Sequence, residues 1–146
     1  MNPILPAIPT FNRPPPHRTA VKRTISTDDA PAAVGAYSQA TTNGSLLFTA
    51  GQLPLTTEGE LLDDESVATQ TEQALDNVLA ILAEEGADAS DLLKVTIFLG
   101  DIEDFDEMNE TYGTYFDAEP PARSAVEVGN VPKGAALEIE AIADVE

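Results

Sequence analysis

A single arginine stands in the main body of a very acidic chain. Beyond Thr24 the only cationic residues are Lys94, Arg123 and Lys133, and all 26 acidic residues lie in the same stretch. An arginine side chain presents a planar set of N–H donors that pairs with a carboxylate or a phosphate at two points. Arg123 is therefore the first candidate for binding an anionic substrate. A structural ion pair with one of the many carboxylates explains the residue equally well at this point.

Four further residues are suited to a binding site. Glu138 stands in an apolar-rich segment, where hydrophobic neighbours would raise the pKa of its carboxyl and suit it to proton transfer. A solvated position on an edge strand is the alternative, and spacing alone favours it. Tyr37 could line a site or merely pack, and Asn109 could bind a ligand or cap a loop. Gly51 ends an apolar run, where the backbone must turn or approach another group closely.

The composition excludes several kinds of chemistry. The chain has no cysteine, which rules out disulfides, a thiolate nucleophile and cysteine-ligated metals. Its one histidine, His17, lies in a proline-rich segment, so a histidine triad or a multi-histidine metal site is not available. Any reaction must therefore use carboxylates, hydroxyls, arginine and backbone groups.

The formal net charge of −19 comes from acidic residues spread along the chain. A generalised acidic surface is typical of adaptation to high cytoplasmic salt, where screening removes self-repulsion, so we expect a halophilic source. The lack of a basic stripe argues against a nucleic-acid partner. There is no long apolar run and no apolar segment of signal-peptide type, so we expect a cytoplasmic protein with no membrane partner.

The chain divides into an N-terminal extension and one domain. Residues 1–20 contain six of the eleven prolines and no acidic residue, which predicts a disordered extension, although a binding arm is an alternative. A further hypothesis is that translation begins at Val21, so that this segment is not synthesised. Residues 21–146 are the right length for a single domain.

Residue patterns within this domain predict an α+β fold. The expected elements are strands at 45–51, 94–99, 122–128 and 136–145, and helices at 66–85 and from 101 to the proline pair at 120–121. In the last strand, alternation places four apolar residues on one face: Leu137, Ile139, Ala141 and Ala143. This order favours a two-layer sandwich, with two helices on one face of a mixed β-sheet.

Six short segments, in order and with compatible spacing, match the motifs of one family. They are Gly35–Gln39, Phe48–Pro54, Asp76–Val78, Asn109–Tyr112, Pro121–Val128 and Glu138–Ala143. From about Lys22 to Ala143 the chain resembles the YjgF-like family, also called reactive-intermediate (enamine/imine) deaminases or Rid proteins. The extension over residues 1–20 has no counterpart in that family.

The resemblance implies a chorismate-mutase-like fold and a homotrimer with ligand clefts at the subunit interfaces. In the deaminase branch, Arg123 would hold the substrate carboxylate. Glu138 would position water and transfer protons. Tyr37 and Gly51 would line the cleft, and Asn109 would reach into it.

The activity implied by the resemblance is that of a 2-iminobutanoate/2-iminopropanoate deaminase. Such an enzyme hydrolyses 2-aminoacrylate-type enamines and imines to 2-keto acids and ammonia, and it needs no metal or organic cofactor. The alternative is a non-catalytic trimer that binds or senses keto acids. Two departures are the Ala125 that replaces a frequent cysteine and a short turn before Pro120.

Overall fold

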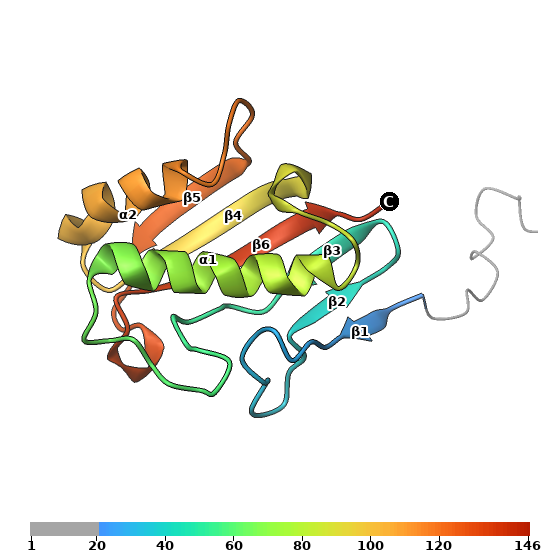
Figure 1. Cartoon of the computed structure of the whole chain (residues 1–146), viewed down its shortest axis with the longest axis horizontal. Coiled ribbons are helices and arrows are strands. Elements are labelled where there is room, and N and C mark those ends of the chain that lie inside the picture. The colour runs from blue at the N-terminus through green and yellow to red at the C-terminus, as the bar shows by residue number, and fades with distance from the viewer. Residues whose placement is uncertain (1–20) are drawn as a thin grey trace, which may run out of the picture.

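The protein is described by a computed structural model of residues 21–146, so the prediction for residues 1–20 lies outside the described residues. One six-stranded sheet forms the back layer (Figure 1). Its strands lie in the order β1 (Arg23–Ile25), β2 (Ala40–Thr42), β3 (Leu46–Thr49), β6 (Leu137–Asp144), β4 (Leu92–Leu99) and β5 (Ala122–Glu127). All neighbours are antiparallel except β4 and β5, which are parallel, so the sheet is mixed as predicted.

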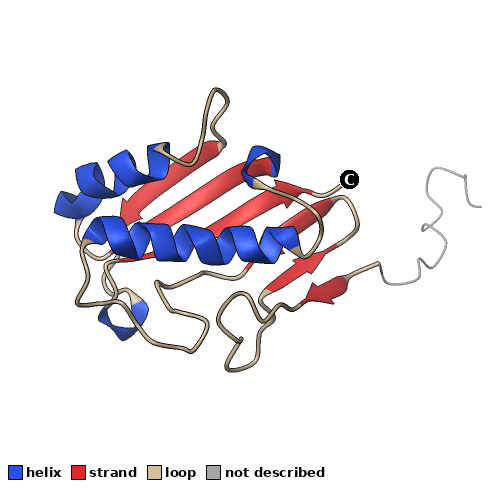
Figure 2. Ribbon diagram, in the orientation of Figure 1, coloured by secondary structure: helices blue, strands red, loops and turns tan. Residues whose placement is uncertain are grey.

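Both helices cover the same face of this sheet (Figure 2). They are α1 (Val67–Ala83) and α2 (Phe105–Gly113), and short 3-10 turns occupy Ala89–Asp91, Ile102–Asp104 and Pro132–Gly134. The predicted two-layer α+β sandwich is therefore confirmed. No helix within residues 21–146 is long and apolar enough to cross a membrane.

The boundaries of α1 follow from its sequence. Ser66 caps the first turn, because its hydroxyl accepts a hydrogen bond from the Thr69 N–H at 3.1 Å. Gly86 follows the helix with φ +74°, a conformation that favours glycine. Helical spacing in the sequence predicts one apolar face made of Val67, Ala74, Leu75, Val78, Leu79 and Leu82. Four of these residues are buried, whereas Val67 and Leu79 are only partly buried.

The core lies between the helices and the sheet. The alternation predicted for β6 is confirmed, since its four apolar residues face the core and are buried. On β4, Val95, Ile97 and Leu99 are also completely buried. Residues at the intervening positions of these strands lie on the opposite face, which no helix of the described part of the chain covers. This second face is called the open face below.

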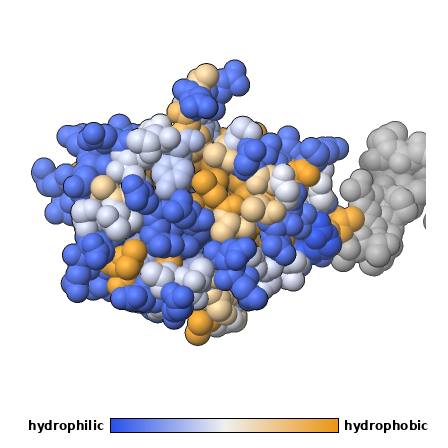
Figure 3. All heavy atoms as spheres, in the orientation of Figure 1, coloured by the Kyte–Doolittle hydropathy of each residue, from blue (hydrophilic) through white to orange (hydrophobic). Residues whose placement is uncertain are grey.

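Two features were not predicted correctly. The second helix ends at Gly113 rather than at the proline pair, because glycine is a poor helix former and the chain continues through turns to β5. Strands β1 and β2 were missed, since three residues are too few to show an alternating pattern. Figure 3 views the helix-covered face, where hydrophilic side chains predominate and hydrophobic residues gather mainly near the centre.

Candidate functional site

Arg123 is held by α2. It lies on the edge strand β5, and its Nη1 donates a hydrogen bond to Asn109 Oδ1 at 2.8 Å. Its Cζ atom lies 4.7 Å from the ring centroid of Tyr112 and 5.5 Å from that of Phe105. These distances fall in the range of attractive cation–π contacts. The guanidinium is thus fixed by one amide oxygen and two aromatic rings, all of them neutral.

No carboxylate neutralises Arg123 among residues 21–146. The one ion pair within 4.0 Å in this part of the chain joins Arg23 to Glu85. Within the described part of the chain, Arg123 is therefore not held by a structural ion pair. Since Asn109 accepts only one of the five guanidinium N–H donors, the remaining donors are available to an anionic ligand.

A cavity of about 410 Å³ lies beside this arginine. Its lining combines polar and aromatic side chains with a proline pair, namely Asn109, Tyr112, Gly113, Phe116, Asp117, Pro120, Pro121 and Arg123. The cavity is therefore formed by the end of α2, the following turn and the start of β5. The lining carries one cation, Arg123, which suits a ligand carboxylate, and one acidic residue, Asp117, so the cavity as a whole is not cationic.

Glu138 occupies a different environment. It lies on β6, between β3 and β4 in the sheet, and it is only partly exposed. The interpretation as a solvated edge residue is therefore wrong. Burial raises the pKa of the Glu138 carboxyl, and the neighbouring charge of Glu140 raises it further. The direction of the pKa shift agrees with the prediction from the sequence.

Gly51 provides the space that Glu138 occupies. A Cβ atom at position 51 would overlap the Oε1 atom of Glu138 and would lie 2.7 Å from its Cδ atom. The two segments are fixed side by side, because Gln52 and Ile139 exchange backbone hydrogen bonds of 2.7 and 3.0 Å. The close backbone approach predicted at Gly51 is thus an approach to the Glu138 side chain.

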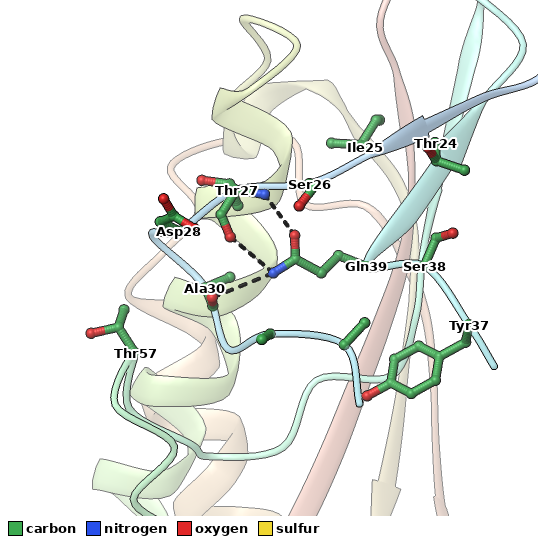
Figure 4. A pocket seen from close by; sticks show the side chains of 12 residues that line it. Thr24, Ile25, Ser26, Thr27, Asp28, Ala30, Tyr37, Ser38, Gln39 and Thr57 are labelled. Carbon is green, nitrogen blue, oxygen red and sulfur yellow. Dashed lines mark hydrogen bonds between the residues drawn. The ribbon is translucent and has the colours of Figure 1, made fainter. Parts of the chain in front are cut away.

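Tyr37 lies in the loop between β1 and β2, beside a cavity of about 470 Å³ (Figure 4). Its side chain is 54% exposed, and its hydroxyl accepts a hydrogen bond from the Val34 N–H at 3.3 Å. The buried amide of Gln39 holds this loop. It donates to the carbonyl groups of Thr27 and Pro31 at 3.0 and 2.8 Å and accepts from the Thr27 N–H at 2.7 Å.

One chain brings together only part of the predicted site. Arg123 contacts Asn109, and Gly51 adjoins Glu138, but the register separates these two pairs. Arg123 is level with Val95, whose side chain faces the helices, whereas Glu138 is level with Phe98 on the open face. Along β4 these positions are three residues, or roughly 10 Å, apart. Tyr37 lies near β1, at the other end of the sheet from β5.

The sequence of residues 27–145 matches the protein family described as Endoribonuclease L-PSP. The chain belongs to this family. It is 44% identical to the 2-iminobutanoate/2-iminopropanoate deaminase of Escherichia coli K12, over 84% of this chain and 98% of that protein. It is 48% identical to the chloroplastic Reactive Intermediate Deaminase A of Arabidopsis thaliana, over 84% of this chain and 65% of that protein.

Solved structures of the family have the same fold. A crystal structure of E. coli TdcF with bound serine has a TM-score of 0.80 and 41% sequence identity to this chain, and the match covers 84% of this chain and 98% of that one. The predicted membership of the YjgF-like, or Rid, family is therefore confirmed.

Reasoning from the sequence gave no role to three residues that shape these sites, although Gln39 and Tyr112 lie in matched motifs. Phe105 and Tyr112 flank Asn109 at helical spacing, four residues before it and three after it, so all three lie on one side of α2. That spacing was a usable signal. Gln39 was included in a motif, but its role depends on backbone carbonyls that only the folded loop brings together.

Proposed function

We propose that this protein hydrolyses reactive 2-aminoacrylate-type enamines and imines to 2-keto acids and ammonia. The observation that carries this proposal is the guanidinium of Arg123, which faces a cavity and has no carboxylate partner among the described residues. Relatives at 43–48% identity are named as deaminases of this kind. The proposed enzyme is a 2-iminobutanoate/2-iminopropanoate deaminase.

In the proposed mechanism, Arg123 binds the carboxylate of the imino acid and orients the imine carbon. Water adds to this carbon, and Glu138 accepts a proton from the water and returns it to the nitrogen. In the resulting carbinolamine, a second proton passes from the hydroxyl to the amino nitrogen, the C–N bond breaks, ammonia leaves, and the C=O bond of the keto acid forms. The raised pKa of Glu138 suits a group that both accepts and donates a proton.

We propose further that the complete site forms between two chains of a homotrimer. Arg123 and Asn109 of one chain would face Glu138, Gly51 and Tyr37 of the next. Two observations support this arrangement. Arg123 and Glu138 lie on opposite faces of one sheet, and the open face carries exposed apolar side chains.

The exposed apolar residues of the open face lie on two strands. Phe48 on β3 and Val126 on β5 are each 45% exposed. Both side chains lie on the open face, because Phe48 pairs with Ile142 and Val126 pairs with Phe98. Ile142 and Phe98 are intervening positions of β6 and β4, which lie on that face. Burying them against a second copy would be favourable by roughly 25 cal/mol for each square ångström of apolar area. Sedimentation at high salt would measure whether three chains associate.

The activity is tested by coupling the protein to a serine or threonine dehydratase in the presence of semicarbazide, which traps the imine. The wild-type protein should suppress semicarbazone formation and accelerate the appearance of pyruvate or 2-oxobutanoate. Arg123→Ala should abolish this effect without dissociating the trimer. If the wild-type protein binds a keto acid but does not suppress the trapping, the alternative of a binding or regulatory protein replaces the enzyme.

The high net charge supports one more proposal, that the protein works in a cytoplasm rich in salt. With a net charge of −19, self-repulsion should weaken as salt screens it. Activity and unfolding temperature should therefore rise between about 0.1 and 2 M KCl. A decline of both over that range would contradict the proposal.

A further inference from the structure

We propose that Tyr112 is a positioning residue, whose ring holds the Arg123 guanidinium ready to bind the substrate carboxylate. This inference rests on the proposed function, since it concerns the same anion-binding group. Tyr112 would act through Arg123 rather than on the reacting atoms. The proposal goes beyond the expected site residues, because Tyr112 ends a matched motif but was given no role in the site.

Arg123 packs against a ring that the core holds in place. Tyr112 is only 4% exposed, so the core of the domain fixes its ring in place. The ring of Phe116 packs against it, with 4.9 Å between the ring centroids. Arg123 is only partly buried and ends a long flexible side chain, and its Cζ lies 4.7 Å from the Tyr112 centroid. The rigid ring therefore restricts the mobile guanidinium.

An aromatic ring can hold a guanidinium without occupying its N–H donors. A carboxylate partner would neutralise its charge and occupy two N–H donors in a bidentate pair. An aromatic face attracts the cation through the π electrons and uses none of these donors. In a chain with 26 acidic residues, neutral contacts keep Arg123 free for an external carboxylate.

The hydroxyl oxygen of Tyr112 is buried and has no hydrogen-bond partner within residues 21–146. A buried tyrosine usually gives its hydroxyl a partner. The contact that Tyr112 does make with the site is the contact of its ring with Arg123. Phenylalanine should therefore preserve the role, and leucine should not.

The test compares Tyr112→Leu with Tyr112→Phe in the full-length protein. Calorimetric titration with 2-oxobutanoate measures carboxylate binding independently of turnover. Loss of a cation–π contact should weaken the binding of 2-oxobutanoate about tenfold in Tyr112→Leu, whereas Tyr112→Phe should stay within about twofold of wild type. In the dehydratase-coupled assay, Tyr112→Leu should need about ten times more substrate for half-maximal rate, with kcat changed less than about threefold.

A control separates this effect from lost packing. Tyr115 lies in the turn after α2, and its hydroxyl donates to Asp76 of α1 at 2.8 Å rather than contacting Arg123. Tyr115→Leu should lower the unfolding temperature but leave 2-oxobutanoate binding unchanged. If Tyr112→Leu fails to fold, Phe105→Leu removes the second ring, at 5.5 Å, and should weaken binding in the same direction.

The outcomes are distinct. The role of the ring would be overturned if Tyr112→Leu bound 2-oxobutanoate with wild-type affinity. It would also be overturned if Tyr112→Phe and Tyr112→Leu lost the same affinity. If Phe105→Leu has to be used instead, an unchanged affinity in that variant would overturn it. A wild-type protein without deaminase activity, whose binding of 2-oxobutanoate still depends on the Tyr112 ring, would refute the proposed function and support this inference.

Discussion

The surroundings of Arg123 and of Glu138 tune two charged groups in opposite directions. Arg123 lies on an edge strand under α2, where its hydrogen-bond and ring contacts are neutral and no carboxylate of residues 21–146 lies within 4.0 Å. Glu138 lies on an inner strand, where burial and Glu140 favour the protonated carboxyl. The first environment suits binding of an anion, and the second suits exchange of a proton.

Placing the two groups on opposite faces of one sheet has a chemical consequence. If Glu138 lay within a salt-bridge distance of Arg123, the guanidinium would lower the carboxyl pKa and would itself be neutralised. In the proposed two-chain site, separation within the chain would preserve both properties until a substrate binds. Variants of each region test this division of roles.

Glu138→Gln should have the largest effect. The amide keeps the shape of the side chain but cannot accept a proton, so kcat should fall by about 10²- to 10⁴-fold. Binding of 2-oxobutanoate should change much less, because Arg123 remains. A fall in affinity as large as the fall in kcat would contradict the division of roles.

The same variant should also change the dependence of stability on pH. Folding raises the pKa of Glu138 above its ordinary value of 4.5. Protonation of this carboxyl therefore makes its full contribution to the free energy of unfolding only below that pH. This contribution is lost as pH rises through the raised pKa. Thermal unfolding should therefore show the greatest advantage of Glu138→Gln over wild type near neutral pH, and that advantage should shrink below pH 4.5.

Mixing two inactive variants tests whether the regions belong to different chains. Arg123→Ala and Glu138→Gln should each be nearly inactive. After unfolding and refolding together in equal amounts, a cyclic trimer should regain about a quarter of the wild-type sites, since each interface needs one intact arginine and one intact glutamate. Activity no higher than the sum of the separate variants would place both residues of each site in one chain.

Gly51→Ala should produce a smaller loss that acts only on the Glu138 region. The new methyl group would overlap the carboxylate end of the Glu138 side chain, which can move aside at little cost to folding. A displacement of about 1 Å at a catalytic group can lower the rate about 10²-fold. In the Glu138→Gln background the same change should add much less. Fully additive losses would show that Gly51 acts through another group.

The sequence predicted the layers of this fold better than it predicted the site. Helical spacing located α1 and alternation oriented β6, because both patterns are local. Composition and apolar surroundings made Arg123 and Glu138 candidates, and the family resemblance gave them roles. None of these showed that they point to opposite faces, since this depends on the register across β4. The contact of Arg123 with Tyr112 was also hidden, because it joins an edge strand to a helix.

Glu140→Gln should have the smallest effect and should sharpen the account of Glu138. Glu140 shares the open face with Glu138, and its charge contributes to the raised pKa of that carboxyl, although burial contributes more. Removing the charge should therefore lower the pKa of Glu138, so the acidic limb of the kcat profile should move to lower pH. At neutral pH the rate should change less than about threefold, because a single partly screened charge interacts weakly. A profile that stays in place would mean that burial alone sets the protonation of Glu138.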